Sequence, residues 1–210
     1  AQHRCSIEDP WATIEPADRP EELRRLLRDL GTGDEDAPLE AFQITRFEAT
    51  WTEFEACVAA SACAWGPGDV ANSVLPALVP FEQARAYCGW RGGRLPSLLQ
   101  WRRAASRWDQ KGGGYSMLPL SAAVDPAGEP IGPNEVGGAP SSANDVGVED
   151  LMGNAVEWVS LGSAARCPGE GSDAALVGPI RSFGETVAVG GACLRVPVDG
   201  SVRGGIRCVR

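Results

Sequence analysis

Cysteine has the widest chemical range of the side chains in this sequence, because its thiolate can attack, bind metals or form disulfides. Seven cysteines are present, at positions 5, 57, 63, 88, 167, 193 and 208. None of them forms a C-x-x-C pair and the only histidine is His3, so a zinc site or a Ser-His-Asp triad has little support. Scattered cysteines of this kind indicate disulfides in an oxidising compartment. An odd number leaves one thiol over, and Cys5, near one end, is expected to be that free thiol.

Hard oxygen ligands gather around the segment LMGNAVEWVS. Asp150 and Glu157 supply carboxylates, and Gly153 and Ala155 offer backbone carbonyls between them. Calcium takes about six to eight such oxygens at flexible spacing, so these four residues are candidate calcium ligands. The alternative is structural: Asn154 makes a local side-chain turn and Glu157 pairs with an arginine.

The charge balance and the hydropathy of the chain exclude several classes of protein. Net charge is −9, with one lysine against eighteen arginines, a bias typical of a GC-rich bacterial genome. An acidic chain without a basic stripe is a poor candidate for binding nucleic acid. No apolar run reaches the roughly 18 residues of a membrane span, and no phosphate-binding loop motif is present. The sequence opens without methionine, so we expect a secreted or periplasmic protein whose signal peptide has been removed.

A chain of 210 residues predicts one domain with an appendage. Residues 1–40 are charged and punctuated by proline, and the stretch EELRRLLRDL places its leucines on one helical face. We therefore expect a partly helical N-terminal extension, which packs on the domain or joins a partner chain. Residues 41–210 are expected to form the domain itself.

The elements that would position the chemistry are predicted from residue 42 onward. The stretch FQITRFEAT alternates apolar and polar residues like a half-buried strand. Thr50 and Glu53 then form a capping box that starts a helix. A second helix follows Pro80 and stops at a glycine pair, and Ser97 with Gln100 forms the capping box of a third.

Four blocks of the sequence resemble blocks of one family. They are FEATWTEFEAC, VPFEQARAYCGWRGGRLPSLLQWRRAA, VGVEDLMGNAVEWVS and the ending GGIRCVR. In the same order they resemble the opening strand-to-helix element, the A-x-x-Y-C-x-W-x-G-x-R-L-P block, the G-N-V-W-E-W block and the G-F-R-C-V-R terminus of formylglycine-generating (sulfatase-modifying factor) domains. The resemblance covers residues 42–210. It implies an α+β fold, an elaboration of the C-type-lectin-like fold with two helices, small antiparallel sheets and much irregular loop.

The resemblance also implies how some of the cysteines pair as disulfides. Family members bridge the cysteine of the A-Y-C-x-W helix to that of the terminal F-R-C. Cys57 and Cys63 lie close enough in the sequence for a local bridge over a helix end. The pairs that we expect are Cys88–Cys208, which the resemblance implies, together with Cys57–Cys63 and Cys167–Cys193.

A structural calcium ion is a further implication of the resemblance. Family members hold calcium through an acid or amide, two carbonyls and a glutamate that match Asp150, Gly153, Ala155 and Glu157. A second family calcium site uses an asparagine in a loop similar to PNEVGG, here Asn134. The acidic partner of that second site has no clear counterpart in this sequence.

The family's oxidase chemistry depends on two cysteines that follow an R-G-G-S-F segment and hold Cu(I), because soft thiolates suit this ion. In the matching stretch PIRSFGETVAVGGACLRV, Glu185 and Gly190 stand where those cysteines would be, so no copper is expected. Another branch of the family binds non-haem iron through histidines. With His3 as the only histidine, that branch is excluded.

These observations predict a binding or scaffolding module without an intact oxidase site, stabilised by disulfides and calcium outside the cytoplasm. Loops 111–146 and 161–200 are expected to present its surface to a protein or other macromolecular ligand, which a fold alone does not identify. The alternative is a copper-dependent thiol oxidase with a rearranged pair, Cys167 and Cys193. A third possibility is an assembly subunit in which residues 1–40 and Cys5 join a partner chain.

Overall fold

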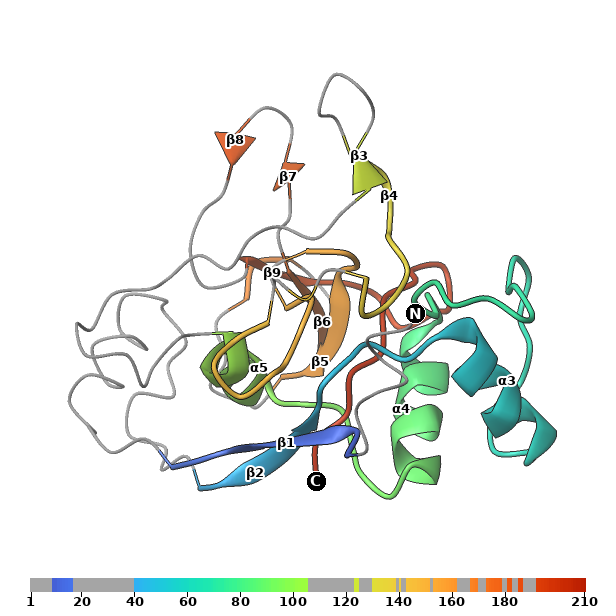
Figure 1. Cartoon of the computed structure of the whole chain (residues 1–210). Coiled ribbons are helices and arrows are strands. Elements are labelled where there is room, and N and C mark those ends of the chain that lie inside the picture. The colour runs from blue at the N-terminus through green and yellow to red at the C-terminus, as the bar shows by residue number, and fades with distance from the viewer. Residues whose placement is uncertain are drawn as a thin grey trace.

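The structure is a computed structural model of the chain (Figure 1). It describes residues 9–16, 40–105, 123–124, 130–138, 140, 143–151, 153–161, 167–169, 173–178, 181–182, 185–186 and 192–210. The helix expected at 21–30, the free thiol Cys5 and most of loop 111–146 lie outside these residues.

The described chain begins with an antiparallel pair of strands, β1 (Trp11–Ile14) and β2 (Phe42–Thr45). In β2 the apolar side chains are buried and the polar ones are half-exposed, as alternation predicts for a strand with one face on a core. Apolar side chains of β1 are buried in the core, so residues 9–16 of the expected N-terminal extension pack on the domain, one of the two arrangements that the sequence left open. The boundary near residue 40 stays a prediction.

Two of the helices, α3 (Trp51–Ala59) and α4 (Phe81–Trp90), pack against each other on one side of the molecule (Figure 1). Helix α3 begins at the predicted capping box: the Thr50 hydroxyl accepts from the Glu53 N–H, and the Glu53 carboxylate accepts from the Thr50 N–H. Helix α4 follows Pro80, whose fixed φ suits a helix entry. It ends before Gly92, which adopts a φ of +76° that favours glycine.

Helix α5 (Leu98–Ala105) starts at the second predicted capping box. The Gln100 N–H donates to the Ser97 hydroxyl over 3.1 Å, and the Ser97 N–H donates to the Gln100 side-chain oxygen over 3.0 Å. All of its described residues are buried, because the helix lies against the main sheet.

That sheet has three antiparallel strands in the order β5 (Glu157–Ser160), β6 (Ala174–Gly178) and β9 (Ala192–Arg195). Two smaller antiparallel sheets accompany it. One pairs β3 (Ala123–Val124) with β4 (Pro130–Gly132), and the other pairs β7 (Arg181–Ser182) with β8 (Glu185–Thr186). Both small sheets project beyond the same edge of the main sheet, at the top of Figure 1.

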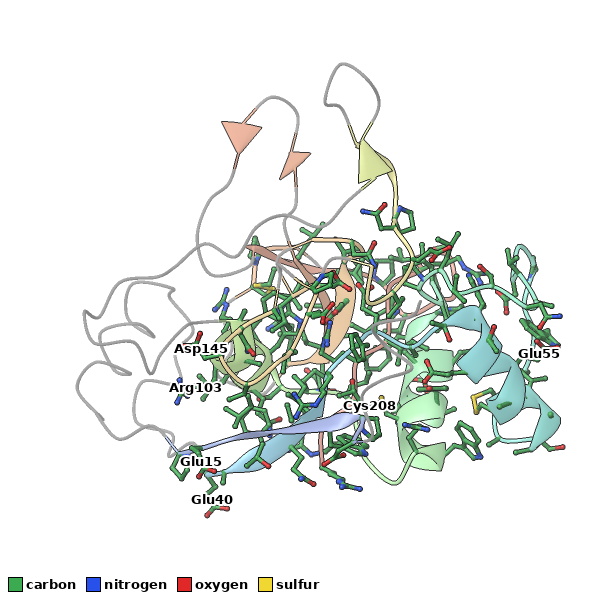
Figure 2. All side chains as sticks on the ribbon, in the orientation of Figure 1. Glu15, Glu40, Glu55, Arg103, Asp145 and Cys208 are labelled. Carbon is green, nitrogen blue, oxygen red and sulfur yellow. A yellow bond between two sulfur atoms is a disulfide. The ribbon has the colours of Figure 1, made fainter. Side chains whose placement is uncertain are left out.

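The C-terminal segment 204–210 runs through the middle of the described fold and joins its parts. Its backbone hydrogen-bonds to β2, to the start of β5, to Val79 and to Arg94. Apolar side chains of this segment enter both hydrophobic clusters, one around α5 and the main sheet and the other between α3, α4 and the segment itself. Figure 2 shows Cys208 where the segment passes between the β1–β2 pair and α4. Within the described residues, no helix is long and apolar enough to cross a membrane.

Candidate functional site

The predicted calcium segment forms a series of turns that lead into β5. Asp150 and Asn154 adopt positive φ values of 66° and 62°, a conformation that aspartate and asparagine tolerate better than most residues. Glu157 is the first residue of β5, and its side chain is 1% exposed. The segment therefore delivers its acids to the interior of the domain.

The carboxylate of Glu157 is held by Arg207 of the C-terminal segment. The Arg207 guanidinium donates to Glu157 Oε1 from Nη2 over 2.8 Å and from Nε over 2.9 Å. Trp101 Nε1 of α5 donates to Glu157 Oε2 over 2.5 Å. Burial alone would lower the pKa of Arg207, but the charge of Glu157 and its hydrogen bonds outweigh burial and raise that pKa. Glu157 thus has the arginine partner that its structural interpretation requires.

A further buried acid, Glu48, lies beside this pair. Asn154 Nδ2 donates to Glu48 Oε2 over 2.5 Å, and the Ala155 N–H donates to Glu48 Oε1 over 3.1 Å. Burial, followed by the negative charge of Glu157, raises the pKa of Glu48 well above its ordinary value. The sequence interpretation did not single out Glu48, although the glutamate of FEATWTEFEAC is part of a block that carries the family resemblance.

The predicted calcium ligands fit the ion only in part. Among the described residues, no donor reaches the Gly153 or Ala155 carbonyl, so both oxygens suit a cation. Asp150 Oδ2 accepts a long hydrogen bond, 3.4 Å, from the Gly137 N–H. Glu157 does not fit in this arrangement, because Arg207 and Trp101 already donate to both of its oxygens. In the part of the chain that the structure describes, no group of three or more His, Cys, Asp and Glu side chains is spaced to hold a metal.

Asn134, the candidate for a second calcium site, lies next to the first. Its backbone N–H donates to the side-chain oxygen of Asn154 over 2.7 Å. This bond ties the described loop 130–138 to the turns around Asp150. Calcium binding at either place stays a prediction.

The six described cysteines form three disulfides. They are Cys57–Cys63, Cys88–Cys208 and Cys167–Cys193, the three pairs that we expected from the sequence. Arg102 of α5 places Nη2 3.8 Å from the sulfur of Cys193. Both cysteines of the rearranged copper pair are therefore together in the structure, and they are joined as a disulfide.

The positions of the family's copper cysteines are only partly described. Glu185 lies in β8, and Gly190 falls outside the described residues. Cys193, the cysteine nearest to these positions in the sequence, lies in β9 and is bridged to Cys167.

Comparison with known proteins identifies the family to which the chain belongs. Residues 21–162 match the family described as "Sulfatase-modifying factor enzyme 1-like domain", and this match covers most of the chain. The chain belongs to that family. The membership confirms the family resemblance that the four sequence blocks carry.

Curated relatives match the chain over a shorter stretch. Hercynine oxygenase from Mycolicibacterium smegmatis is 34% identical over 88 residues, 39% of this chain and 20% of that protein. Inactive C-alpha-formylglycine-generating enzyme 2 from Bos taurus is 36% identical over 94 residues, 39% of this chain and 31% of that protein. The matched region thus spans a fifth to a third of the length of these relatives.

Solved structures resemble the chain over nearly its whole length. CarF matches with a TM-score of 0.57 and 16% identity, over 95% of this chain and 97% of that one. PvdO from Pseudomonas aeruginosa matches with a TM-score of 0.48 and 19% identity, over 96% and 92%. The family match, together with the CarF likeness, confirms the predicted α+β, formylglycine-generating-enzyme-like fold.

Proposed function

We propose that this family member is a non-catalytic binding or scaffolding module that acts outside the cytoplasm. The observation that carries the proposal is the state of its cysteines. All six described cysteines are paired, so no described thiol is available to hold Cu(I), an ion that prefers thiolate ligands. Glu185 and Gly190, at the positions of the family's copper cysteines, offer no soft ligand.

The disulfides also support the proposed compartment. Disulfides form and persist in secreted and periplasmic proteins, whereas cytosolic reductants keep most thiols reduced. Three bridges within one domain of this size are consistent with an oxidising environment.

The ligand surface that we propose is formed by loops 111–146 and 161–200. The two small sheets, β3–β4 and β7–β8, belong to these loops, and both project beyond the same edge of the main sheet (Figure 1). Long loops on a rigid scaffold are a common way to present a binding surface. A protein or another macromolecule is the proposed ligand class, because the two loops together are far longer than a pocket for a small molecule requires.

The relatives support a family in which catalysis is not universal. One relative is named an oxygenase and another is named inactive, and each matches only part of its own length. We propose that this chain, like the relative named inactive, has no catalytic activity.

Calcium is part of the proposal as a structural ion. Asp150 and the carbonyls of Gly153 and Ala155 would supply its oxygens. A calcium titration of the chelator-treated protein, followed by thermal unfolding, tests this point. We expect the midpoint to rise with calcium and not with magnesium, whose smaller octahedral shell needs a tighter ligand set.

A copper-dependent thiol oxidase is the second candidate function. One observation favours it: Cys167 and Cys193 lie together, with Cα atoms 5.6 Å apart, and a buried arginine is close to one sulfur. Reduction of this bridge would leave two neighbouring thiols, which is a suitable ligand pair for Cu(I).

One set of measurements separates the two functions. A non-reducing peptide map with free-thiol counting and metal analysis is combined with oxygen uptake, measured with Cu(I) and a cysteine-containing peptide. A non-catalytic module gives three bridges, a single free thiol at Cys5, no copper and no uptake beyond that of a Cys167→Ser/Cys193→Ser variant. Copper bound to free Cys167 and Cys193, with uptake that the double variant lacks, overturns the proposal in favour of the oxidase.

A further inference from the structure

The disulfide between Cys167 and Cys193 lies beside a positive charge. Arg102 of α5 is buried, and its Nη2 donates to the Cys193 sulfur over 3.8 Å. Cys193 is itself 7% exposed and belongs to the hydrophobic cluster around α5 and the main sheet. Burial in apolar surroundings disfavours a thiolate, whereas a neighbouring guanidinium stabilises it. Arg102 therefore makes Cys193 the better sulfur to carry the negative charge when this bridge is broken.

The other sulfur of the bridge, that of Cys167, lies close to the surface. Cys167 is 8% exposed, and the exposed residues Pro168 and Gly169 follow it. A disulfide is exchanged when a thiolate attacks one sulfur and the other sulfur leaves, and exchange is faster when the leaving thiolate is better stabilised. Attack at Cys167 with departure of Cys193 meets both requirements.

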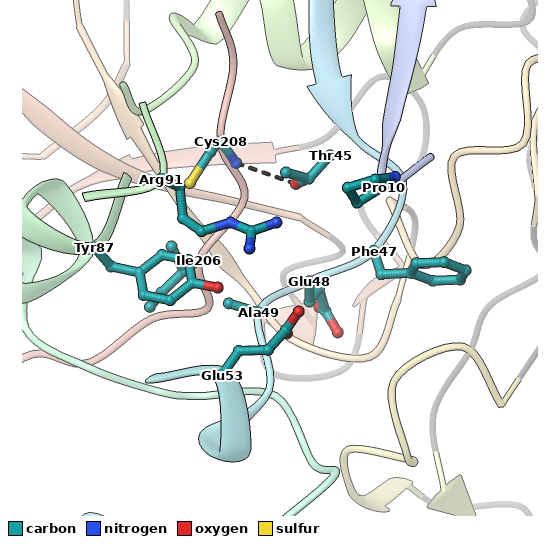
Figure 3. Close-up of a pocket in the computed structure, with 10 residues that line it drawn as sticks. All are labelled: Pro10, Thr45, Phe47, Glu48, Ala49, Glu53, Tyr87, Arg91, Ile206 and Cys208. Atoms are coloured by element: carbon teal, nitrogen blue, oxygen red, sulfur yellow. Dashed lines mark hydrogen bonds between the residues drawn. The ribbon is translucent and has the colours of Figure 1, made fainter. Parts of the chain in front are cut away.

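The long bridge, Cys88–Cys208, is closed to an attacking thiol. Cys88 is 0% exposed and Cys208 is 1% exposed. Cys208 lines a pocket together with Tyr87 and Ile206 (Figure 3), but this pocket is too small to admit a thiol reagent. The bridge should therefore exchange only when the domain opens.

The local bridge, Cys57–Cys63, is accessible but lies in an acidic part of the chain. Cys63 is 8% exposed, as Cys167 is. The sequence from 47 to 84, which includes both cysteines, contains five acidic residues and no lysine or arginine. Glu53 lies one helical turn before Cys57 in α3. Negative neighbours disfavour a further negative charge on sulfur, so this bridge should exchange more slowly than Cys167–Cys193.

The Cys167–Cys193 bridge also fastens segment 167–169 to an edge of the main sheet. Strand β9 is the last in the order of that sheet. The Arg195 N–H donates to the Pro168 carbonyl over 2.7 Å. Gly169, at a φ of +106°, approaches Arg195 so closely that a Cβ would lie 2.5 Å from the Arg195 carbonyl oxygen. The disulfide is the covalent part of this attachment, and its loss leaves segment 167–169 held by non-covalent contacts.

We propose that Cys167–Cys193 is a thiol–disulfide exchange site, reduced by a dithiol protein of the same compartment, and that its reduction releases segment 167–169 from β9. A thiolate of the dithiol forms a bond to the Cys167 sulfur, and Cys193 leaves with the electron pair beside Arg102 and takes up a proton. The second thiol of the dithiol loses its proton and attacks its own partner sulfur in the mixed disulfide. Cys167 then leaves as a thiolate and is protonated. Two electrons and two protons pass to the bridge, and the dithiol becomes a disulfide.

The inference goes beyond the proposed function, because it adds a redox reaction to one part of the proposed ligand surface. Both cysteines lie in loop 161–200, but the exchange chemistry needs no ligand. It also differs from the copper-dependent oxidase, since it uses neither copper nor oxygen. A bridge that resists reduction would overturn the inference and leave the non-catalytic module in place, whereas copper-dependent oxygen uptake would overturn the module alone.

Graded reduction of the full chain tests the order in which the bridges open. The protein, with its free thiols already blocked, is treated with dithiothreitol under native conditions, without oxygen and with a chelator present. New thiols are labelled with N-ethylmaleimide at successive times and assigned by peptide mapping. We expect Cys167 and Cys193 to be labelled at least about tenfold faster than the cysteines of the other two bridges.

Variants of Arg102 test the cause of this order. Arg102→Met is expected to slow the reduction of Cys167–Cys193 about tenfold or more, and Arg102→Lys, which keeps the charge, to restore most of the rate. Arg85→Met is the matched control, because Arg85 lies in an exposed ion pair with Glu82, and its rate should equal that of the native protein. Circular dichroism verifies that each variant is folded.

Amide hydrogen exchange tests the release of the segment. The Arg195 N–H should exchange about tenfold faster in the Cys167→Ser/Cys193→Ser variant than in the bridged protein, because its acceptor at Pro168 is no longer tethered. Four results overturn the inference: equal reduction rates for all three bridges, earlier reduction of Cys57–Cys63, a native rate in Arg102→Met, or unchanged exchange at Arg195. An Arg102→Lys variant as slow as Arg102→Met would also overturn it, since packing rather than charge would then set the rate.

Discussion

The polar residues in the centre of the domain are held by contacts between distant parts of the chain. Arg207 is 0% exposed, and besides Glu157 it donates to the carbonyls of Thr45 and Glu149. A buried guanidinium with these acceptors joins β2, the turn before β5 and β5 itself. Such a group adds little net stability compared with an apolar replacement of both partners, but removal of one partner leaves a buried charge.

Removal of the Arg207 charge is therefore expected to destabilise the folded protein. Arg207→Met leaves the Glu157 carboxylate buried with only the Trp101 donor, and the free energy of unfolding should fall by about 3–5 kcal/mol. Urea unfolding measures this loss. Arg85→Met, at an exposed ion pair, is the matched control and should change stability by less than about 1 kcal/mol. A loss no greater than that of the control would contradict the role assigned to Arg207.

Glu48 predicts the direction of a pH dependence. Its pKa in the folded state is raised, so the folded protein binds this proton more tightly than the unfolded chain does. The associated stability is fully present below the unfolded pKa and is lost as pH rises through the folded pKa. Urea unfolding across this range should show stability falling with pH in the native protein. Glu48→Gln should flatten that fall, whereas Glu82→Gln, at an exposed site, should keep it; an unchanged slope in Glu48→Gln would show that another group titrates.

In the central cluster, the sequence singled out residues that lie close together along the chain, but not the distant residues to which they bond. Asp150, Asn154 and Glu157 lie in one short stretch and were found by their types and spacing. Glu48 and Arg207 lie 106 and 50 residues away from the side chains to which they bond, so no local pattern connects them. The two interpretations of Glu157 could not be separated without knowing which arginine the fold brings to it.

At the scale of the elements, local sequence patterns predicted where helices begin. Both predicted capping boxes are present, and they fix where α3 and α5 begin. The β1 strand was missed because its four residues stand in a charged, proline-rich region, and their pairing with β2 is a tertiary contact. The packing of the glycines likewise depends on tertiary contacts. Their neighbours in the sequence do not indicate which glycines are tightly packed in the fold.

Gly204 and Gly89 make this contrast testable. A Cβ at Gly204 would lie 2.3 Å from Leu176 Cδ2 and 3.0 Å from Trp158 Nε1, whereas a Cβ at Gly89, inside α4, meets nothing within 4 Å. Gly204→Ala is expected to destabilise the domain by about 1–3 kcal/mol through overpacking. Gly89→Ala should stabilise it by about 0.5–1 kcal/mol, because alanine favours a helix interior. Thermal unfolding of both variants measures the signs, and the same sign in both would contradict this packing.

At the scale of the whole molecule, the disulfides differ greatly in the length of chain that they close. Cys88 and Cys208 are 120 residues apart, and Cys57 and Cys63 are 6 apart. In the chain-entropy account, a longer closed loop restricts the unfolded chain more. The long bridge should therefore contribute more to stability than the local one.

Paired serine variants measure this difference. Cys88→Ser/Cys208→Ser is expected to lower the free energy of unfolding by about 4–5 kcal/mol, and Cys57→Ser/Cys63→Ser by about 2 kcal/mol. Urea unfolding under non-reducing conditions gives both values. Equal losses would show that contacts in the folded state, rather than restriction of the unfolded chain, determine the effect.

The central course of residues 204–210 has a consequence for biosynthesis. These residues hydrogen-bond to β2, β5 and Arg94, and they contribute to both hydrophobic clusters, so neither cluster can close before they have been made. A ribosome synthesises them last of all the described residues. The two clusters can therefore close only after this segment has left the ribosome, and until then the apolar faces of β2 and the helices lack part of the surface that covers them.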